Sequence, residues 1–288
     1  PIASGLAMDR HGRGSYLWTP DAQTVGNSAL IRATGHAGAT LVSDVSDEAF
    51  LIANGGQNYY VNIAGDASLA DNEYTTAAGD NENSGKRADA PMASLAALLR
   101  AYDLDAGDVI YVDTGVYSLA SNIVLDAQDS GVTIQGAQTV GHVTVLNRGN
   151  TATGRMVFQF NGADDIALSH LAITGGQYGI QAANAVNSDN LLLTYLDVYG
   201  NTTGGIDIAD SNDQVTLRDS HIHHNGSNGV ELRGADSLVR DNRIIGNSSS
   251  GITLAGLRSQ VVDNVVYGNG SWGITANVYG GDAADWIV

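Results

Sequence analysis

The 288-residue chain has no cysteine, three prolines, three phenylalanines and three tryptophans. Without cysteine there can be no disulfide, thiolate nucleophile or cysteine-ligated zinc, but this absence does not identify a cellular compartment. With so few large aromatic residues, any core must be mostly aliphatic. No segment resembles a signal peptide or a membrane span, and we expect no membrane insertion. Because the chain begins with Pro1 rather than Met, we expect it to be part of a longer multidomain protein.

Positive charge is also scarce, with 13 Lys and Arg against 31 Asp and Glu and a net charge of -18. A protein that binds nucleic acid needs a basic surface for the phosphates, so we expect no nucleic-acid partner. The same charge would repel an acidic polysaccharide unless calcium bridged the carboxylates. No cofactor is certain from the sequence, and Ca²⁺ is the one candidate.

A short phrase, glycine followed by a β-branched residue, repeats in the last third of the chain. It begins at Gly179, Gly205, Gly229, Gly251 and Gly273, that is, every 22 to 26 residues. Short runs rich in β-branched residues alternate with Asn, Asp, Ser and Gly, which is typical of strands and turns and leaves no room for a helix. A repeat of this length without helices predicts an all-β parallel β-helix, in which each repeat forms one coil.

Stacked coils would place equivalent residues in columns along the axis. Two aliphatic columns are expected to point inward, formed by Val198, Ile222, Ile244 and Val266 and by Ile206, Val230, Ile252 and Ile274. A third column, Asn201, Asn225, Asn247 and Asn269, is expected to form an asparagine ladder at a tight turn, with a structural role.

The pattern of apolar and polar residues divides the chain into two parts. Residues 1–53 alternate apolar and polar residues between turn-like clusters and predict a small β-sandwich-like remnant or a cap. Residues 54–288 are predicted to form the β-helix, with an entry and capping helix within 59–103 and coils over 104–288. The helix is expected over 91–100, with Pro91 in its first turn, and would cover the open end of the first coil.

The entry segment carries a family resemblance. It contains Pro91-Met92-Ala93-Ser94-Leu95, then Ala106-Gly107-Asp108-Val109-Ile110-Tyr111-Val112, and finally Ser130-Gly131-Val132-Thr133-Ile134-Gln135-Gly136. Together these motifs resemble the start of the pectate lyase-like superfamily of right-handed parallel β-helices, and the resemblance extends from about Tyr59 to Tyr279. It implies a single-stranded right-handed β-helix. It does not imply one activity, because the superfamily includes lyases, hydrolases, epimerases and adhesins.

The C-terminal coils are similar to those of bacterial mannuronan C-5 epimerases, which carry a Tyr-Gly-Phe-Asp-Pro-His motif. Matched position by position, only the aspartate is retained, as Asp207. The tyrosine falls on Gly204, the histidine on Ala209, and a second aspartate of the next coil on Arg233. The resemblance therefore puts epimerase activity through that motif in doubt.

The residues themselves suggest a different site in the same coils. In the repeated phrase the residue after the β-branched one should point outward, which predicts an external row of Gln181, Asp207, Glu231, Thr253 and Thr275. Asp207 and Glu231 would lie one coil apart with Arg233 nearby. A carboxylate pair and a cation could supply the base and the charge neutraliser for removing a proton beside a uronate carboxylate. The alternative is a solvated acidic face with one salt bridge.

Other polar residues extend the list of candidates. His221 and His223 should share one orientation and could act as acid and base or bind a metal, although no third ligand is evident, and His224 should turn away. Substrate contacts are expected from Gln181, Tyr199 and Tyr267. Asp210 and Asp213 are candidate calcium ligands. Any substrate cleft is expected over residues 140–235.

Two functions remain open from the sequence. The first is an extracellular or cell-surface module that engages polysaccharide, with lyase-like or epimerase-like chemistry on an acidic glycan as its narrower form. The second is a non-catalytic spacer or adhesin segment of a large surface protein.

Overall fold

The structure is a computed structural model that describes all residues except 1, 11, 19–24, 54–57 and 277–288. The chain divides into two compact units, Pro1–Gly56 and Gln57–Val288. The boundary between the units follows residue 56, three residues beyond the expected boundary, which followed residue 53.

Within its described residues, the first unit contains four strands. β1 (Val25–Ala29) pairs antiparallel with β4 (Phe50–Ala53), and β2 (Arg32–Ala37) pairs antiparallel with β3 (Thr40–Val45). Gly38, in the left-handed region at φ 64°, lies between β2 and β3. The side chains of β3 are exposed over its full length, so this strand contributes to no buried core.

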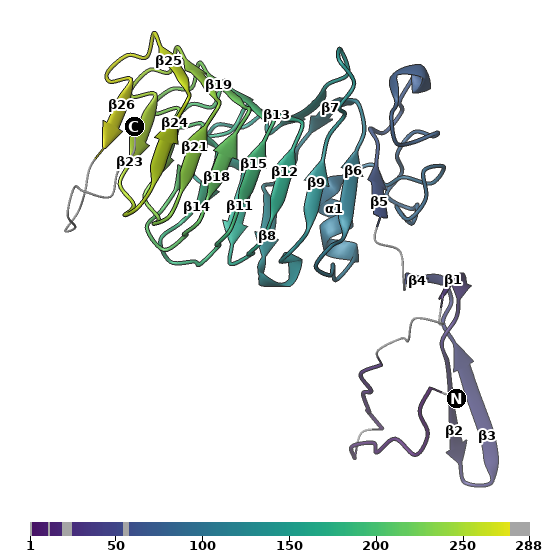
Figure 1. Ribbon diagram of the computed structural model, residues 1–288. Helices are drawn as coiled ribbons and strands as arrows, with labels where there is room; N and C mark the ends of the chain where they lie inside the picture. The colour runs from purple at the N-terminus through teal and green to yellow at the C-terminus, as the bar shows by residue number, and fades with distance from the viewer. Residues whose placement is uncertain (1, 11, 19–24, 54–57, 277–288) are drawn as a thin grey trace. The chain divides into compact units, whose positions relative to one another are not determined.

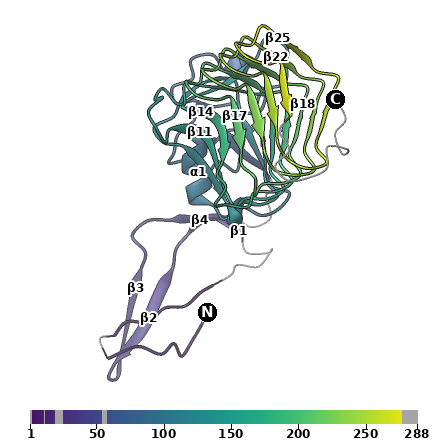
Figure 2. The same cartoon turned by 90° about the vertical axis from the view of Figure 1, so that its left-hand side faces the viewer.

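The second unit is a parallel β-helix of seven three-stranded coils (Figures 1 and 2). Sheet 1 contains β5 (Asn58–Val61), β6 (Val109–Val112), β9 (Thr133–Gln135), β12 (Ala167–Ser169), β15 (Leu192–Thr194), β18 (Thr216–Arg218), β21 (Leu238–Arg240) and β24 (Gln260–Val262). Sheet 2 contains β7 (Gly115–Ser118), β10 (Thr144–Asn147), β13 (Leu171–Thr174), β16 (Asp197–Tyr199), β19 (His221–His223), β22 (Arg243–Ile245) and β25 (Val265–Tyr267). Sheet 3 contains β8 (Ile123–Asp126), β11 (Met156–Asn161), β14 (Tyr178–Ala182), β17 (Ile206–Ile208), β20 (Val230–Leu232), β23 (Ile252–Leu254) and β26 (Ile274–Ala276). The predicted all-β solenoid is therefore confirmed.

The strand register explains the repeating residues. Val198 pairs with Ile222 in sheet 2 and Ile206 with Val230 in sheet 3, and all four side chains are buried. Complete burial of one such aliphatic side chain stabilises the fold by about 1.5–3 kcal/mol, so successive coils extend a continuous dry core. The last members of the two predicted columns depart from this, because Val266 is only partly buried and Ile274 is exposed.

The asparagine ladder is also present as predicted. The amide nitrogen Nδ2 of Asn201 donates to Oδ1 of Asn225 at 3.0 Å, that of Asn225 to Asn247 at 3.0 Å, and that of Asn247 to Asn269 at 3.1 Å. Asn201, Asn225 and Asn247 are buried. Stacked amides thus satisfy each other and the backbone at the turn between sheets 2 and 3, where water cannot.

A helix and a long loop close the first coil. The helix α1 (Leu95–Ala101) begins four residues after Pro91, because Met92 still pairs with Val61 and the Ser94 hydroxyl caps the helix by accepting from the Ala97 amide. It contacts β8, the end strand of sheet 3, and so takes the place of a further strand there. The loop between β5 and α1 contains the short 3-10 helix η1 (Leu69–Asp71), and a second one, η2 (Ala127–Asp129), follows β8. The buried carboxylate of Asp113 holds the loop by accepting from the amides of residues 73, 74 and 75.

Candidate functional site

The outward face of sheet 3 carries the predicted polar row. Ile206 and Ile208 are buried on either side of Asp207, so alternation along β17 turns the Asp207 side chain outward. The parallel register places Gln181, Asp207, Glu231, Thr253 and Thr275 opposite one another on successive strands. The structure thus brings Asp207 and Glu231 together one coil apart, as expected.

Arg233 organises the centre of this row. Its Nη2 lies 3.0 Å from Oδ1 of Asp207, its Nε lies 3.2 Å from Oδ1 of Asp210, and its Nη1 contacts Oε1 of Glu231. Burial acts to lower the pKa of the Arg233 guanidinium, but the adjacent Asp207 and Glu231 carboxylates outweigh it and raise the pKa. One cation therefore serves three carboxylates, and the cluster keeps a formal charge of about -2.

Two amides complete the network. Nε2 of Gln181 donates to Oδ2 of Asp207 at 3.2 Å, and Nδ2 of Asn228 donates to Oε2 of Glu231 at 2.9 Å. Oδ1 of Asp207 pairs with Arg233 by distance but lacks a well-aligned hydrogen bond and is buried. That oxygen therefore has capacity to accept a hydrogen bond that no aligned donor uses.

Tyr178 is part of this cluster although the sequence did not single it out. A Cβ atom on Gly204 would lie 3.1 Å from Cδ1 of Tyr178, so the ring packs over the glycine backbone. Gly204 is the position at which the epimerase motif has its tyrosine. Burial raises the pKa of the Tyr178 hydroxyl, and the charges of Asp207 and Glu231 raise it further. A neighbouring coil therefore supplies a neutral phenol beside the acidic pair.

The two candidate calcium ligands do not converge. Asp210 pairs with Arg233, while Oδ1 of Asp213 accepts from the Ala235 amide at 2.6 Å. Among the described residues, neither belongs to a cluster of three potential metal ligands. A carboxylate already paired with a guanidinium is a poor partner for a cation, so this arrangement gives the calcium prediction no support.

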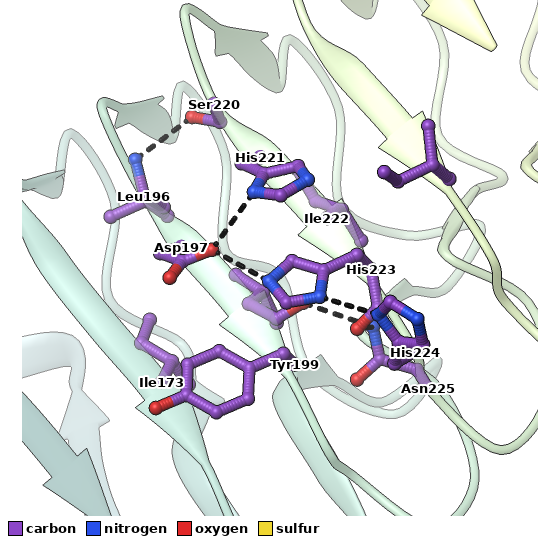
Figure 3. Close-up of polar contacts among 12 residues, drawn as sticks. Ile173, Leu196, Asp197, Tyr199, Ser220, His221, Ile222, His223, His224 and Asn225 are labelled. Carbon is purple, nitrogen blue, oxygen red and sulfur yellow. Dashed lines mark hydrogen bonds and ion pairs between the residues drawn. The ribbon is translucent and has the colours of Figure 1, made fainter.

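A second cluster lies on sheet 2, around β16 and β19 (Figure 3). Nε2 of His223 lies 3.0 Å from Oδ1 of Asp197, and Nδ1 of His221 lies 3.4 Å from the same oxygen. The two imidazole rings stack with centroids 4.1 Å apart. Burial lowers the pKa of His221, the His223 ring lowers it further, and Asp197 opposes both. His221 and His223 share one orientation, as predicted from strand alternation.

Asp197 is the partner that the sequence analysis missed. It pairs with His221 in the register that aligns Val198 with Ile222, so the signal was available in the aligned columns. His224 does not turn away as expected, because its Nδ1 lies 2.8 Å from Nδ1 of His223. Its backbone is in the left-handed region, which turns the side chain back toward the strand.

The predicted substrate contacts are divided between the two sheets. Gln181 lies on sheet 3, whereas Tyr199 and Tyr267 lie on sheet 2. The Tyr199 ring stacks on His223 with centroids 5.2 Å apart, and Tyr267 contacts the guanidinium of Arg243. The predicted substrate contacts therefore lie on two different sheets of the β-helix.

Two of the hollows on the described surface of the β-helix bear on the predicted cleft. One of about 690 Å³ lies between α1 and β8, with Arg100, Asn122 and Asp126 in its lining. The other, of about 650 Å³, lies where sheets 1 and 2 meet, and its lining includes Asp197, His221 and Arg243. Neither includes Asp207 or Glu231. The second is lined by residues 195–197 and 219–221, inside the range 140–235 where a cleft was expected, but at the corner between sheets 1 and 2. Repeated tight turns form that corner, with Asp219, Asp241 and Asp263 all at positive φ.

Comparison with known proteins agrees with this architecture. The family model described as "Right handed beta helix region" matches residues 108–281, more than half of the chain. No curated protein matches the chain. No helix among the described residues is long and apolar enough to cross a membrane.

Three solved structures are similar in fold. The A-module of mannuronan C-5 epimerase AlgE6 from Azotobacter vinelandii has 19% identity and a TM-score of 0.47, with 58% of this chain and 49% of that one covered. Pectate lyase Pel9A has 14% identity and a TM-score of 0.37, with 80% of each chain covered. An alginate lyase from Paenibacillus sp. has 14% identity and a TM-score of 0.28, with 62% of this chain and 92% of that one covered. The present chain thus spans about half the length of the epimerase module, and at these identities the likenesses say nothing about activity.

Proposed function

The chain belongs to the right-handed β-helix family, and from the polar row that this fold displays on sheet 3 we propose that the protein binds polysaccharide along that face. The observation that carries the proposal is the cluster of Asp207, Glu231 and Arg233, one coil apart and beside Tyr178.

The side chains of this face suit sugar hydroxyl groups. Carboxylates accept strong, charge-assisted hydrogen bonds from hydroxyls, and the amides of Gln181 and Asn228 can both donate and accept. The Tyr178 ring offers an apolar surface on which a pyranose can stack. Because equivalent positions recur at about 4.8 Å along the axis, the face offers a polymer several similar contacts in line.

The charge of the cluster favours a particular mode of binding. Three carboxylates share one guanidinium, which leaves the cluster negatively charged. A neutral glycan carries no charge and can approach the cluster without repulsion. An acidic glycan needs a bridging cation such as Ca²⁺, or it needs Arg233 to exchange one carboxylate partner for a carboxylate of the sugar. The narrower form of the proposal, lyase-like or epimerase-like turnover of an acidic glycan, depends on that exchange. We place the protein outside the cell or on its surface, where such polymers occur.

The rival proposal is a spacer or adhesin segment without a sugar site. It is favoured by the extent to which the row satisfies itself, since Glu231 already has a partner for each carboxylate oxygen. In that case the cluster would serve only to keep neighbouring coils in register.

A glycan array separates these proposals. Neutral and acidic polysaccharides would be tested with wild-type protein and with Asp207→Asn/Glu231→Gln, in Ca²⁺ and in chelator. We expect binding by the wild type that falls by at least about 10-fold in the double variant, equivalent to about 1.4 kcal/mol. Binding that survives the double substitution would place the sugar elsewhere, and an array without any binding would favour the spacer. Any acidic glycan that binds would then be assayed for release of unsaturated uronate by its ultraviolet absorbance.

A further inference from the structure

The cluster of Asp197, His221 and His223 on sheet 2 has the composition of a metal site, and we propose that it binds a first-row divalent metal ion such as Zn²⁺. The three ligand atoms lie within 4.8 Å of one another. Two imidazoles and one carboxylate form a donor set suited to first-row metals with open positions, whereas Ca²⁺ prefers oxygen ligands alone.

The two distances to the Asp197 carboxylate match a shared ion. Two ligand atoms that each lie about 2.1 Å from one metal are separated by about 3.0 Å at a right angle and about 3.4 Å at a tetrahedral angle. Oδ1 of Asp197 lies 3.0 Å from Nε2 of His223 and 3.4 Å from Nδ1 of His221. Each imidazole binds a metal in the plane of its ring, so the stacked rings of His221 and His223 must rotate to share one ion with Asp197.

The scaffold holds the ligands in place. His221 and His223 flank the buried Ile222 on β19, and Asp197 pairs with His221 across the parallel ladder. Each ligand thus projects from a strand fixed by the core, and sites on such rigid elements keep their geometry.

His223 also has a hydrogen-bond partner, His224, that lies outside the proposed set of metal ligands and is called the outer partner below. With Nε2 of His223 on a metal, its Nδ1 would carry the proton and donate to Nδ1 of His224, 2.8 Å away. Ligating histidines commonly use their second nitrogen in this way, which fixes the tautomer and the ring orientation. The same contact gives His224 a positioning role.

The surroundings allow an ion to enter. The side chains of Asp197 and His221 are 47% and 38% exposed, and both line the hollow of about 650 Å³. Arg243 is the next residue along the His221 column, and its guanidinium reaches Tyr267 on the following coil. Asp219, Asp241 and Asp263 line the same hollow, but Asp219 pairs with Arg218 and Asp241 with Arg240, so the charge around the hollow is close to balanced.

The test is metal binding by the untagged full chain. Zn²⁺ affinity would be measured in competition with a chromophoric chelator and stoichiometry by elemental analysis, while the visible absorption of bound Co²⁺ would report the ligand geometry. We expect one ion per chain. His221→Ala and His223→Ala should each weaken binding by at least about 100-fold, beyond the about 10–100-fold expected for loss of the outer partner in His224→Ala.

Two further variants separate loss of the metal ligands from loss of the fold and from nonspecific binding of Zn²⁺. Asp197→Asn keeps the shape of the side chain and should also weaken binding, with the circular dichroism spectrum unchanged. His170→Asn removes a histidine outside the cluster from a left-handed position that Asn tolerates, and it should bind Zn²⁺ like the wild type. Absence of saturable Zn²⁺ binding, or equal losses in His170→Asn and His221→Ala, would overturn the proposal.

Discussion

Replacement of Asn225 by alanine tests how far the buried asparagine ladder stabilises the coils. Oδ1 of Asn225 accepts from the backbone amide of Asn201 at 3.2 Å and from its Nδ2 at 3.0 Å. In Asn225→Ala the buried Asn201 amide N–H loses this acceptor, whereas Nδ2 of Asn201 keeps the backbone oxygens of Ile173 and Tyr199. A buried donor without a partner costs about 1–3 kcal/mol, so we predict a loss of about 1–3 kcal/mol in the free energy of unfolding.

Urea unfolding followed by circular dichroism measures the total loss. Because solenoids can unfold locally, hydrogen exchange at the Asn201 amide provides a second readout that should show faster exchange in the variant. The matched control is Asn187→Ala, which removes an exposed side-chain contact to Asp189 and should cost less than about 0.5 kcal/mol. A loss below about 1 kcal/mol for Asn225→Ala, or unchanged exchange at Asn201, would refute the reasoning.

The other predictions concern charge, space and pH. Arg233→Met leaves three carboxylates close together and should lower the free energy of unfolding by about 1–3 kcal/mol, measured in urea. The control Arg240→Met removes an exposed ion pair and should cost less than about 1 kcal/mol. Equal losses in the two variants would contradict a stabilising role for the Arg233 network. Gly226→Ala places the new Cβ 2.0 Å from the backbone oxygen of Thr202 and should lower the melting temperature markedly. The control Gly273→Ala should have little effect, because the atom nearest to its new Cβ is 3.8 Å away. Burial raises the pKa of Tyr117, with Asp113 and Asp66 adding to it, so the fold favours the neutral phenol. Stability is therefore retained below the unfolded pKa of about 10 and lost as the pH rises above it. The fall in melting temperature in alkali should be shallower in Tyr117→Phe, and an identical fall would contradict this assignment.

The fold could be predicted from the sequence because the coils stack in parallel, so that equivalent residues of successive repeats pair with one another. Once Ile206 is aligned with Val230, the positions of Asp207 and Glu231 follow without further information. The same logic applied to Val198 and Ile222 places Asp197 beside His221, and this pairing was overlooked rather than hidden.

Other features depend on side-chain direction, which periodicity does not encode. Tyr178 packs over Gly204 because a glycine on the next coil leaves room for the ring. Arg233 reaches Asp210 beyond the end of β17, a contact that depends on the path of the turn. The start of α1 at Leu95 rather than near Pro91 was decided by the pairing of Met92 with Val61, a tertiary contact.

The proposed polysaccharide face is tested most directly by calorimetric titration of the best-binding glycan into two variants that lose one carboxylate on different sheets. Asp207→Asn alters sheet 3 and Asp197→Asn alters sheet 2, with the same change of side chain. The account predicts that Asp207→Asn weakens binding by at least about 10-fold and that Asp197→Asn leaves it unchanged. Equal affinities for wild type and Asp207→Asn, or a loss confined to Asp197→Asn, would contradict it.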